Sequence, residues 1–319
     1  MSLLVTGSSG FLGKYLLQFI IAKDYDFKLL SRSPLNGVPI EKQFLVDDFR
    51  TITDVRRVFE DVDVIVHCAA RVHVMNDCSS NPLEAFREVN TYGTLSLAQK
   101  AADAGVKRFI FISSIKVNGE STELSFPFKP DNNFVPTDPY GLSKYEAEVG
   151  LRTITQKTDM EVVIIRPPLV YGPGVKGNFA TMMKWVNNGV PIPLGGIKGN
   201  RRSLVSLDNL VDLIVTCIAH TNAANQTFLV SDDDDLSMTG LLQNIAKALD
   251  VASRLIPIPS SWFILAAKLI GKPSISQRLC GSLQVDISKT KELLNWTPPY
   301  STAECLKKTA DSFIENNRK

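Results

Sequence analysis

The chain has 319 residues, and its 44% hydrophobic and 21% charged content is typical of a globular protein, which excludes intrinsic disorder and a coiled coil as the main architecture. Its length exceeds the roughly 250–300 residues at which one hydrophobic core stops growing, so we expect a large domain and a smaller lobe. The 35 basic and 33 acidic side chains leave a net charge of +2, which gives no indication of nucleic-acid binding.

In chain order, short apolar runs alternate with stretches of helical period. Strands are predicted at 3–5, 27–30, 64–66, 109–112 and 162–165, and helices at 14–22, 83–104, 143–155 and 237–249. This alternation predicts an α/β protein built on a doubly wound parallel sheet, with helices on both faces.

The alternation of strands and helices changes after Gly172, and Pro and Gly are frequent from residue 167 to residue 199. We expect the dinucleotide-binding domain to comprise 1–166 and a returning segment near 203–231. The smaller C-terminal α/β lobe, which would hold the substrate, is expected to comprise 167–202 and 232–319. The four aspartates at 232–235 precede the predicted helix 237–249, and negative charge is favourable at a helix N-terminus.

Three glycines, Gly7, Gly10 and Gly13, follow the first predicted strand at the spacing GxxGxxG. Glycine lets the backbone turn tightly and approach a pyrophosphate closely, and the N-terminus of the next helix offers unpaired N–H groups and a positive dipole. A glycine triplet alone fits an ordinary strand-to-helix turn, but its place in the first βαβ unit favours dinucleotide binding.

The end of the second predicted strand bears on the choice of dinucleotide. An Asp or Glu there commonly holds the ribose hydroxyls of NAD, and this sequence has Ser31 and Arg32 instead. No carboxylate would repel a 2′-phosphate, and the Arg32 guanidinium could pair with one, so NADP(H) is favoured and NAD(H) stays possible. After the third strand, Asp48 and Phe49 could meet the adenine, or Asp48 could cap a loop.

Tyr140 and Lys144 lie four residues apart, which places both on one face of a helix. A nearby ammonium group stabilises a phenolate, so we expect Lys144 to lower the pKa of Tyr140 from its usual value of about 10. Such a tyrosine is a suitable acid and base for an alcohol–ketone pair. Ser114 follows the predicted strand 109–112, at the edge where open α/β sheets bind ligands, and its hydroxyl could hold the reacting oxygen.

Other patterns exclude further classes of protein. The histidines share no metal-ligand spacing, so we expect no metal site, and the cysteines form no CxxC pair and are odd in number, which indicates reduced thiols in a cytoplasmic protein. We find no targeting segment and expect the mature protein to begin inside its first strand. The apolar run 262–270 is shorter than the about 20 residues of a membrane span. These histidines are His67, His73 and His220, and the cysteines are Cys68, Cys78, Cys217, Cys280 and Cys305.

Together the motifs resemble the extended short-chain dehydrogenase/reductase family. They run almost the length of the chain in the family's order: Thr6-Gly-x-x-Gly-x-x-Gly13, His67-Cys-Ala-Ala70, Asn90-Thr-Tyr-Gly-Thr94, Ser113-Ser114, Tyr140-x-x-x-Lys144, Arg166-Pro-Pro-Leu-Val-Tyr-Gly-Pro173, Asp286-Ile-Ser-Lys289 and Leu294-Asn-Trp296. Within the family, the chain looks most like the UDP-glucose 4-epimerase group and its 4-ketosugar reductase relatives. The resemblance implies a Rossmann domain, a nucleotide-sugar lobe and a homodimer built from helices 83–104 and 143–155.

The resemblance also implies roles for individual residues. Ser114, Tyr140 and Lys144 match the catalytic triad: the tyrosine exchanges a proton with the sugar hydroxyl, the serine orients that oxygen, and the lysine also holds the nicotinamide ribose. Cofactor-binding positions would be Gly7, Gly10, Phe11, Leu12, Gly13, Ser31, Arg32, Asp48, Phe49, Ala69, Ala70, Tyr140, Lys144 and Pro167. Asn178, Arg202 and Arg278 would contact the diphosphate of a UDP-sugar, because guanidinium groups bind phosphate oxygens in pairs.

Some positions depart from the epimerase pattern, namely Ser31, Lys116 and Leu169. A site suited to a 2′-phosphate fits a reductase, which exchanges NADP, better than an epimerase, which retains NAD. The stretch 281–284 has no bulky aromatic and leaves room for an N-acetyl group.

We therefore expect NADPH-dependent reduction of a UDP-4-keto-6-deoxy-N-acetylhexosamine, for surface polysaccharide synthesis. The alternative is a UDP-hexose or UDP-N-acetylhexosamine 4-epimerase with tightly bound NAD. A 4,6-dehydratase lacks support, since no Asp-Glu pair accompanies the serine, and a dinucleotide-sensing scaffold fits poorly with an intact triad.

Overall fold

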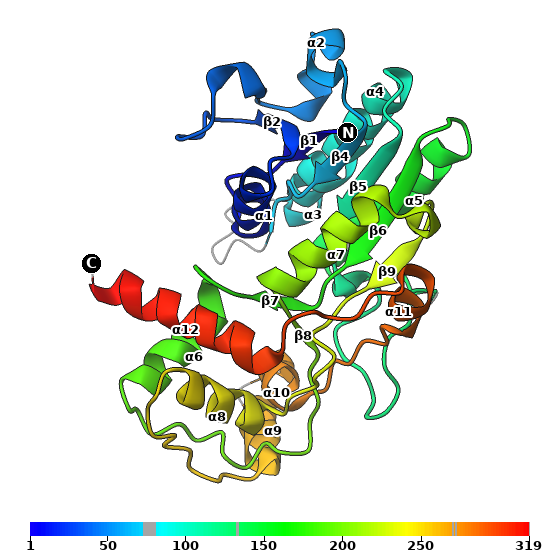
Figure 1. The fold of residues 1–319 in the computed structure, drawn as a ribbon. Helices are drawn as coiled ribbons and strands as arrows, with labels where there is room; N and C mark the ends of the chain where they lie inside the picture. Colours follow the sequence, from blue (N-terminus) through cyan, green and yellow to red (C-terminus); the bar gives the residue numbers. More distant parts are fainter. Residues whose placement is uncertain (73–80, 132–133, 270, 272, 319) are drawn as a thin grey trace.

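The computed structural model describes residues 1–72, 81–131, 134–269, 271 and 273–318 (Figure 1). Their strands build one parallel seven-stranded sheet with the order β3-β2-β1-β4-β5-β6-β9. The strands are β1 (Ser2–Thr6), β2 (Asp26–Ser31), β3 (Gln43–Leu45), β4 (Val64–His67), β5 (Arg108–Ile112), β6 (Glu161–Arg166) and β9 (Thr227–Leu229). The predicted α/β fold, a doubly wound parallel sheet of Rossmann type, is confirmed.

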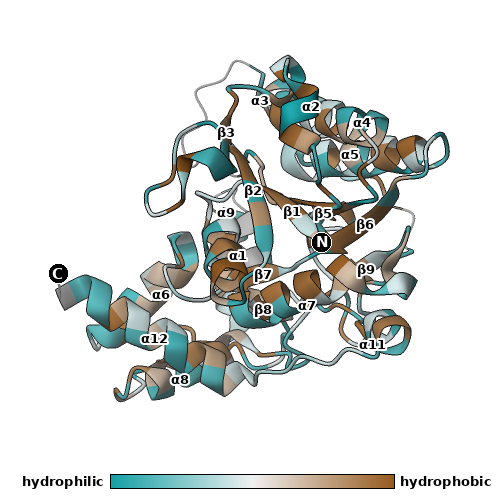
Figure 2. Ribbon diagram, turned by 45° about the horizontal axis from the view of Figure 1, so that its top comes forward, coloured by the Kyte–Doolittle hydropathy of each residue, from teal (hydrophilic) through white to brown (hydrophobic). Residues whose placement is uncertain are grey.

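Side chains that alternate along each strand enter two different hydrophobic cores, one on each face of the sheet. Leu3 and Val5 pack against one set of helices, whereas Leu4 between them packs against the other set. Both faces are therefore buried, which explains why the strands read as continuous apolar runs. The first set contains α1 (Phe11–Ala22), α7 (Leu207–Ala219) and α11 (Ser288–Leu294), and the second contains α2 (Val55–Phe59), α4 (Thr94–Asp103) and α5 (Pro139–Thr155) (Figure 2).

Two predicted helices differ from the structure in detail. The predicted helix 83–104 consists of α3 (Pro82–Arg87), a π-helical turn η3 (Glu88–Gly93) and α4. The predicted helix 143–155 begins earlier, at Pro139, because Asp138 caps its N-terminus by accepting a hydrogen bond from the Gly141 N–H.

The smaller lobe has its own hydrophobic core. Phe179 and Met183 of α6 (Gly177–Asn187), Leu242 of α8 (Met238–Ala248) and Leu306 of α12 (Thr302–Arg318) are buried there together. The structure also contains the paired strands β7 (Leu169–Tyr171) and β8 (Leu204–Ser206) and the helices α9 (Ser260–Leu269) and α10 (Pro273–Cys280). Short helical turns are η1 (Ile40–Lys42), η2 (Phe49–Thr51), η4 (Ile115–Val117) and η5 (Thr221–Ala223).

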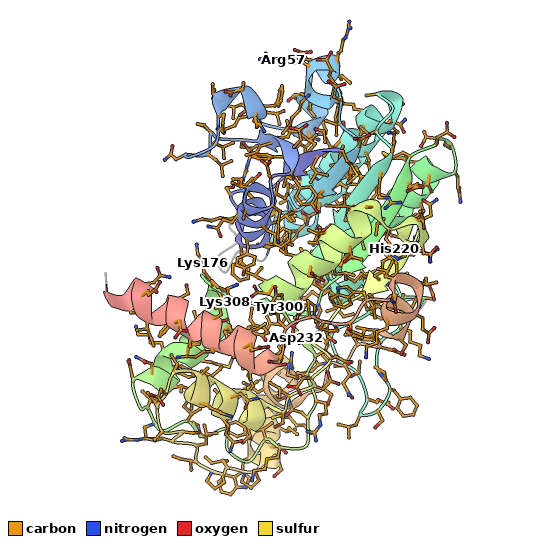
Figure 3. All side chains as sticks on the ribbon, in the orientation of Figure 1. Arg57, Lys176, His220, Asp232, Tyr300 and Lys308 are labelled. Carbon is orange, nitrogen blue, oxygen red and sulfur yellow. The ribbon has the colours of Figure 1, made fainter. Side chains whose placement is uncertain are left out.

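The aspartates at 232–235 serve tertiary contacts and not the N-terminus of α8. Ser237 caps α8, and its first turn contains no acidic residue. Asp232, labelled in Figure 3, accepts a hydrogen bond of 2.6 Å from the buried Tyr171 hydroxyl, and Asp235 accepts one of 2.5 Å from Ser203. The expectation of a stabilised helix end is therefore wrong, because closer partners from β7 and the β8 segment take these carboxylates.

Candidate active site

The glycine loop between β1 and α1 tolerates no side chain at two of its positions. Gly7 has φ +72°, and a Cβ atom there would lie 2.5 Å from the Ala69 nitrogen. A Cβ atom on Gly13 would lie 2.1 Å from the Gly7 carbonyl oxygen. Strand, loop and helix thus approach at backbone distance, the arrangement in which backbone N–H groups are free to contact a pyrophosphate.

The N-terminus of α1 suits an anion. Gly10 supplies no side-chain cap, and no acidic residue stands in the first turn, which includes Phe11 and Leu12. The Ser8 hydroxyl in the same loop is buried and has no hydrogen-bond partner within the described residues. An unpartnered buried hydroxyl beside an uncapped helix end is what a phosphate-binding loop would show without its ligand. The residues present therefore fit a dinucleotide.

Other predicted cofactor positions lie at the carboxyl ends of neighbouring strands. Ala69 and Ala70 follow β4, and the Ala69 N–H donates to the Thr6 hydroxyl across 3.3 Å. Pro167 follows β6, and its carbonyl accepts a hydrogen bond of 3.0 Å from the Ile115 N–H, just after Ser114. The parallel strands thus bring these segments to one edge of the sheet.

Three predicted cofactor residues, Ser31, Arg32 and Asp48, lie at the end of β2 and in the segment after β3. Ser31 is buried and donates to the Ser33 carbonyl, whereas Arg32 is exposed. Asp48 caps η2 and forms an ion pair with Arg50, which holds the pKa of this carboxyl below its usual value. The structure shows Asp48 as a cap of this loop. Contact of Asp48 with the adenine stays a prediction.

Ser114, Tyr140 and Lys144 come together where β5 ends and α5 begins. The Ser114 side chain accepts a hydrogen bond from the Lys116 N–H in η4, and it lies close enough to the Tyr140 phenol to act on the pKa of that phenol. The Lys144 ammonium donates to the Ile112 carbonyl across 2.9 Å and lies 4.4 Å from the centroid of the Phe111 ring. A sugar hydroxyl bound at this edge would meet a hydroxyl, a phenol and an ammonium group.

Burial governs the electrostatics of this cluster. It raises the pKa of Tyr140 to about 12, with Ser114 acting in the lowering direction and Asp138 in the raising direction. It lowers the pKa of Lys144 to about 7, because an ammonium group loses its hydration there. The expectation that Lys144 lowers the pKa of Tyr140 is wrong for this structure, since desolvation outweighs other influences and the ammonium is held by Ile112.

A buried ion pair below the cluster was not predicted. Glu148 and Arg166, each almost fully buried, form a salt bridge of 2.5 Å between α5 and β6. The Ser113 hydroxyl donates to the same carboxylate across 2.6 Å, and Asn118 accepts from the Arg166 guanidinium across 2.9 Å. The position of Glu148, one turn after Lys144 on the same helix face, was the signal that could have revealed it.

Asn90 was quoted as part of a motif, but its contacts were not predicted. It lies in the π-helical turn η3, and its side chain bonds both the N–H and the carbonyl of Arg71. Its amide also donates to Ser143, the neighbour of Lys144, across 3.0 Å. Local π-helical turns are frequent at functional sites, and this one joins the segment after β4 to α5.

The predicted diphosphate residues lie in the smaller lobe. Arg202 is partly buried, which lowers the pKa of its guanidinium, and it donates to the Gly281 carbonyl across 3.2 Å. Gly281 directly follows α10, which carries Arg278, and the side chain of Arg278 is outside the described part of the structure. Asn178 is exposed in the first turn of α6. His73 and Cys78 also lie outside the described residues.

A family model described as the NAD dependent epimerase/dehydratase family matches residues 3–231. The chain belongs to this family. It is 51% identical over 322 residues, covering 100% of this chain and 97% of the relative, to a protein of Vibrio cholerae named UDP-glucose 4-epimerase. It is 28% identical over 325 residues, 97% of this chain and 94% of the relative, to N-acetyl-alpha-D-glucosaminyl-diphospho-ditrans,octacis-undecaprenol 4-epimerase of Escherichia coli O157:H7.

A solved structure supports the same assignment of the fold. UDP-glucose 4-epimerase of Thermotoga maritima, described with UDP-glucose, superposes with a TM-score of 0.76 at 22% identity, covering 99% of this chain and 100% of that one. As a member of the epimerase/dehydratase family, the protein is an enzyme of the short-chain dehydrogenase/reductase type. Among its described residues, no helix is both long and apolar enough to cross a membrane.

Proposed function

We propose that the protein is a 4-epimerase of a UDP-hexose or UDP-N-acetylhexosamine that retains a nicotinamide dinucleotide. The observation that carries this proposal is the approach of Ser114 to Tyr140, four residues before Lys144, at the edge of the sheet where the glycine loop also lies. Both named relatives are 4-epimerases, which favours this reading over the reductase expected from the sequence.

In the proposed reaction, the protein moves a proton and positions the sugar. Tyr140, as its phenolate, accepts the proton of the C4 hydroxyl and returns it to the new hydroxyl, and Ser114 orients that oxygen by a hydrogen bond. Lys144 would leave Ile112 to hold the nicotinamide ribose. A bound nicotinamide supplies reversible hydride transfer at C4, while the protein supplies placement.

The smaller lobe is proposed to bind the UDP group. Arg202 offers a guanidinium that is already partly desolvated, so less hydration is lost when it meets a diphosphate. Its hydrogen bond to Gly281 brings it to the end of the helix that carries Arg278. Asn178 would add an amide at the N-terminus of α6.

Two copies are further proposed to associate through the segment 83–104, which comprises α3, η3 and α4, and through α5, as the family resemblance implies. α4 and α5 pack on each other on one face of the sheet, and Tyr92 of η3 and Val149 of α5 are exposed. Sedimentation velocity tests this, with Val149→Asp expected to shift a dimer toward monomer.

The proposed reaction is tested with purified protein and no added cofactor. UDP-glucose and UDP-N-acetylglucosamine are supplied separately, and the sugar protons are followed by NMR. A 4-epimerase converts one of them to its C4 epimer, and denaturation then releases a dinucleotide. A protein that converts neither sugar, but oxidises added NADPH in the presence of a UDP-4-keto sugar, is the reductase instead.

Arg32 tests the choice of dinucleotide. A retained NADP(H) predicts that Arg32→Ala weakens NADPH binding at least about tenfold, about 1.4 kcal/mol, and leaves NADH binding unchanged, because the guanidinium would pair with the 2′-phosphate. A retained NAD predicts that the substitution changes neither affinity. Titration of dinucleotide-free protein measures both affinities, with the exposed Arg56→Ala as the control. Equal losses for the two cofactors would contradict an NADP(H) preference.

A further inference from the structure

Helix α9 presents an apolar stripe to the outside of the smaller lobe. Trp262, Leu265 and Leu269 have exposed fractions of 69%, 60% and 79%, and their spacing of three and four residues places them on one helix face. Ile264, on a different side of the helix, is also exposed, whereas Phe263 packs inward against the core of the lobe. We call Trp262, Leu265 and Leu269 the α9 face. Figure 1 shows α9 at the lower end of the molecule.

The segment that leads into α9 carries a further exposed apolar side chain. Ile192 pairs with Leu255, and Gly196 pairs with Pro259, so that 190–196 runs beside 254–259. Ile256 in this segment is about half exposed. Single large apolar side chains are often exposed on protein surfaces. A cluster of them marks a surface that binds a membrane or another molecule.

The stretch of sequence that carries α9 has charged side chains of one sign. Residues 251–285 contain four basic side chains and no Asp or Glu, although the whole chain has a net charge of only +2. Lys268 lies in the last turn of α9 and is exposed, and Arg254 before the helix is exposed as well. The other two, Lys272 and Arg278, belong to this stretch by sequence alone, and Arg278 is assigned above to the diphosphate.

We propose that the α9 face docks on the surface of an anionic lipid bilayer. A helix of this kind lies in the headgroup region, with Trp and Leu at the acyl boundary and lysine and arginine at the phosphates. Each basic residue near an anionic surface adds attraction, so the absence of acids favours lipid over a neutral partner. A second copy is disfavoured, because a twofold contact would bring the basic side chains of 251–285 against themselves, and this stretch contains no acid to pair with them.

Docking would place the bilayer near the segment that follows the active-site serine. Gln277 in α10 donates to Ser121 across 2.9 Å, and Thr122 pairs with Ser282 after α10. The chain from Ser114 to Ser121 therefore connects the candidate active site to the two helices at the lipid surface. Docking of the α9 face on lipid does not depend on the reaction proposed for the active site.

The test is flotation of the full chain with vesicles of phosphatidylglycerol and phosphatidylcholine, compared with vesicles of phosphatidylcholine alone. The wild type should float with the anionic vesicles only. Replacing Trp262, Leu265 and Leu269 with Ser should weaken binding at least about tenfold. Ile40→Ser combined with Leu45→Ser, which changes exposed apolar residues elsewhere, should leave binding unchanged.

Lys268→Gln should weaken anionic binding about fivefold and reduce its dependence on salt. A second measurement does not depend on folding of the triple variant. Brominated lipid should quench the tryptophan fluorescence of the wild type, and Trp262→Phe should remove this quenching. Failure of the wild type to float, equal binding to both vesicle types, or unchanged flotation of the serine variant would overturn the proposal. So would a wild type that stays off vesicles but self-associates through the α9 face. Sugar conversion by each variant is measured separately, so failure of docking is distinguishable from failure of the proposed reaction.

Discussion

At the scale of single residues, the candidate active site disfavours the phenolate form of Tyr140 and the ammonium form of Lys144. Burial raises the pKa of Tyr140 to about 12 and lowers that of Lys144 to about 7. At neutral pH the phenol of the dinucleotide-free protein therefore keeps its proton, and the lysine is close to half protonated. The proposed reaction requires the phenol to lose that proton when the dinucleotide and the Lys144 ammonium are placed beside it. A dry site of this kind strengthens every electrostatic contact that a bound sugar makes inside it.

Tyr140 provides the direct test of the proposed proton transfer. We expect Tyr140→Phe to lower kcat about 10²–10⁴-fold, because the ring remains and the acid-base group is lost. Dinucleotide affinity should change little. Steady-state conversion and dinucleotide titration measure the two quantities, and Tyr145→Phe on the same helix is the matched control. Turnover that survives in Tyr140→Phe would refute the assignment.

Lys144 predicts a pH dependence of stability for the dinucleotide-free protein. Its pKa is about 7 in the folded state against 10.5 for the ordinary side chain, so between these values the unfolded chain binds more protons. The free energy of unfolding should therefore rise as pH rises from 7, by about 2 kcal/mol at pH 9. Denaturant unfolding at both pH values measures this. Lys144→Met should lack the rise, and an equal rise in the variant would contradict the explanation.

At the scale of elements, α5 carries the site and the ion pair that anchors it. Tyr140, Lys144 and Glu148 are spaced by four residues, so one face of this helix meets the sheet. Glu148 binds β6 through Arg166 and the end of β5 through Ser113. The helix therefore cannot shift along the sheet without breaking a buried ion pair.

Removal of the Glu148 charge should be costly. We expect Glu148→Gln to lower the free energy of unfolding by about 3 kcal/mol, because the Arg166 guanidinium stays buried without its partner. Conversion of both residues to leucine should cost less than Glu148→Gln alone. Denaturant unfolding measures this. Glu146→Gln, which opens the half-exposed pair with Arg87, should cost less than about 1 kcal/mol. Equal losses at 146 and 148 would contradict the anchoring role.

The features that depend on local spacing were predictable from the sequence. The glycine spacing, the four-residue step from Tyr140 to Lys144 and the alternation of strands and helices each follow from the geometry of one element. Contacts between distant segments were not predictable in this way. The partner of Glu148 is 18 residues further along, and the π-helical turn that places Asn90 has no sequence pattern that we recognised.

The aspartates at 232–235 show the same limit. Their local sequence favours a helix N-terminus, but Tyr171 and Ser203, brought close by the fold, bind two of them instead. The net pKa shift of Tyr140 was also beyond prediction, because it depends on how completely neighbouring elements cover the phenol.

At the scale of the whole molecule, one polar cluster joins the smaller lobe to the nucleotide-binding sheet. Tyr15 on α1 donates to Asp208 on α7 across 2.6 Å, and Lys308 on α12 forms an ion pair of 2.5 Å with the same carboxylate. Lys308 is labelled in Figure 3, on the side of α12 toward α1. The C-terminal helix is thus held against the helix that would bind the dinucleotide.

Asp208→Asn should loosen that contact. Because Lys308 is half exposed, we expect a loss of about 1 kcal/mol, seen as about fivefold faster amide hydrogen exchange in α12. Asp311→Asn, which removes a partner of Lys307 on the same helix, should change exchange much less. Mass spectrometry of peptides from α12 measures both. Equal exchange in the two variants would contradict the role of Asp208.

The position of β9 at the edge of the sheet has a consequence for synthesis of the chain. β9 pairs with β6, yet β7, α6, β8 and α7 are made between them. During translation β6 emerges before β9. The edge of β6 therefore stays unpaired until part of the smaller lobe and then β9 have left the ribosome. Domains usually fold in the order in which they are made. Here the first domain finishes only after the second has begun, so a pause in translation near residue 167 would leave an open strand edge available to pair with another nascent chain.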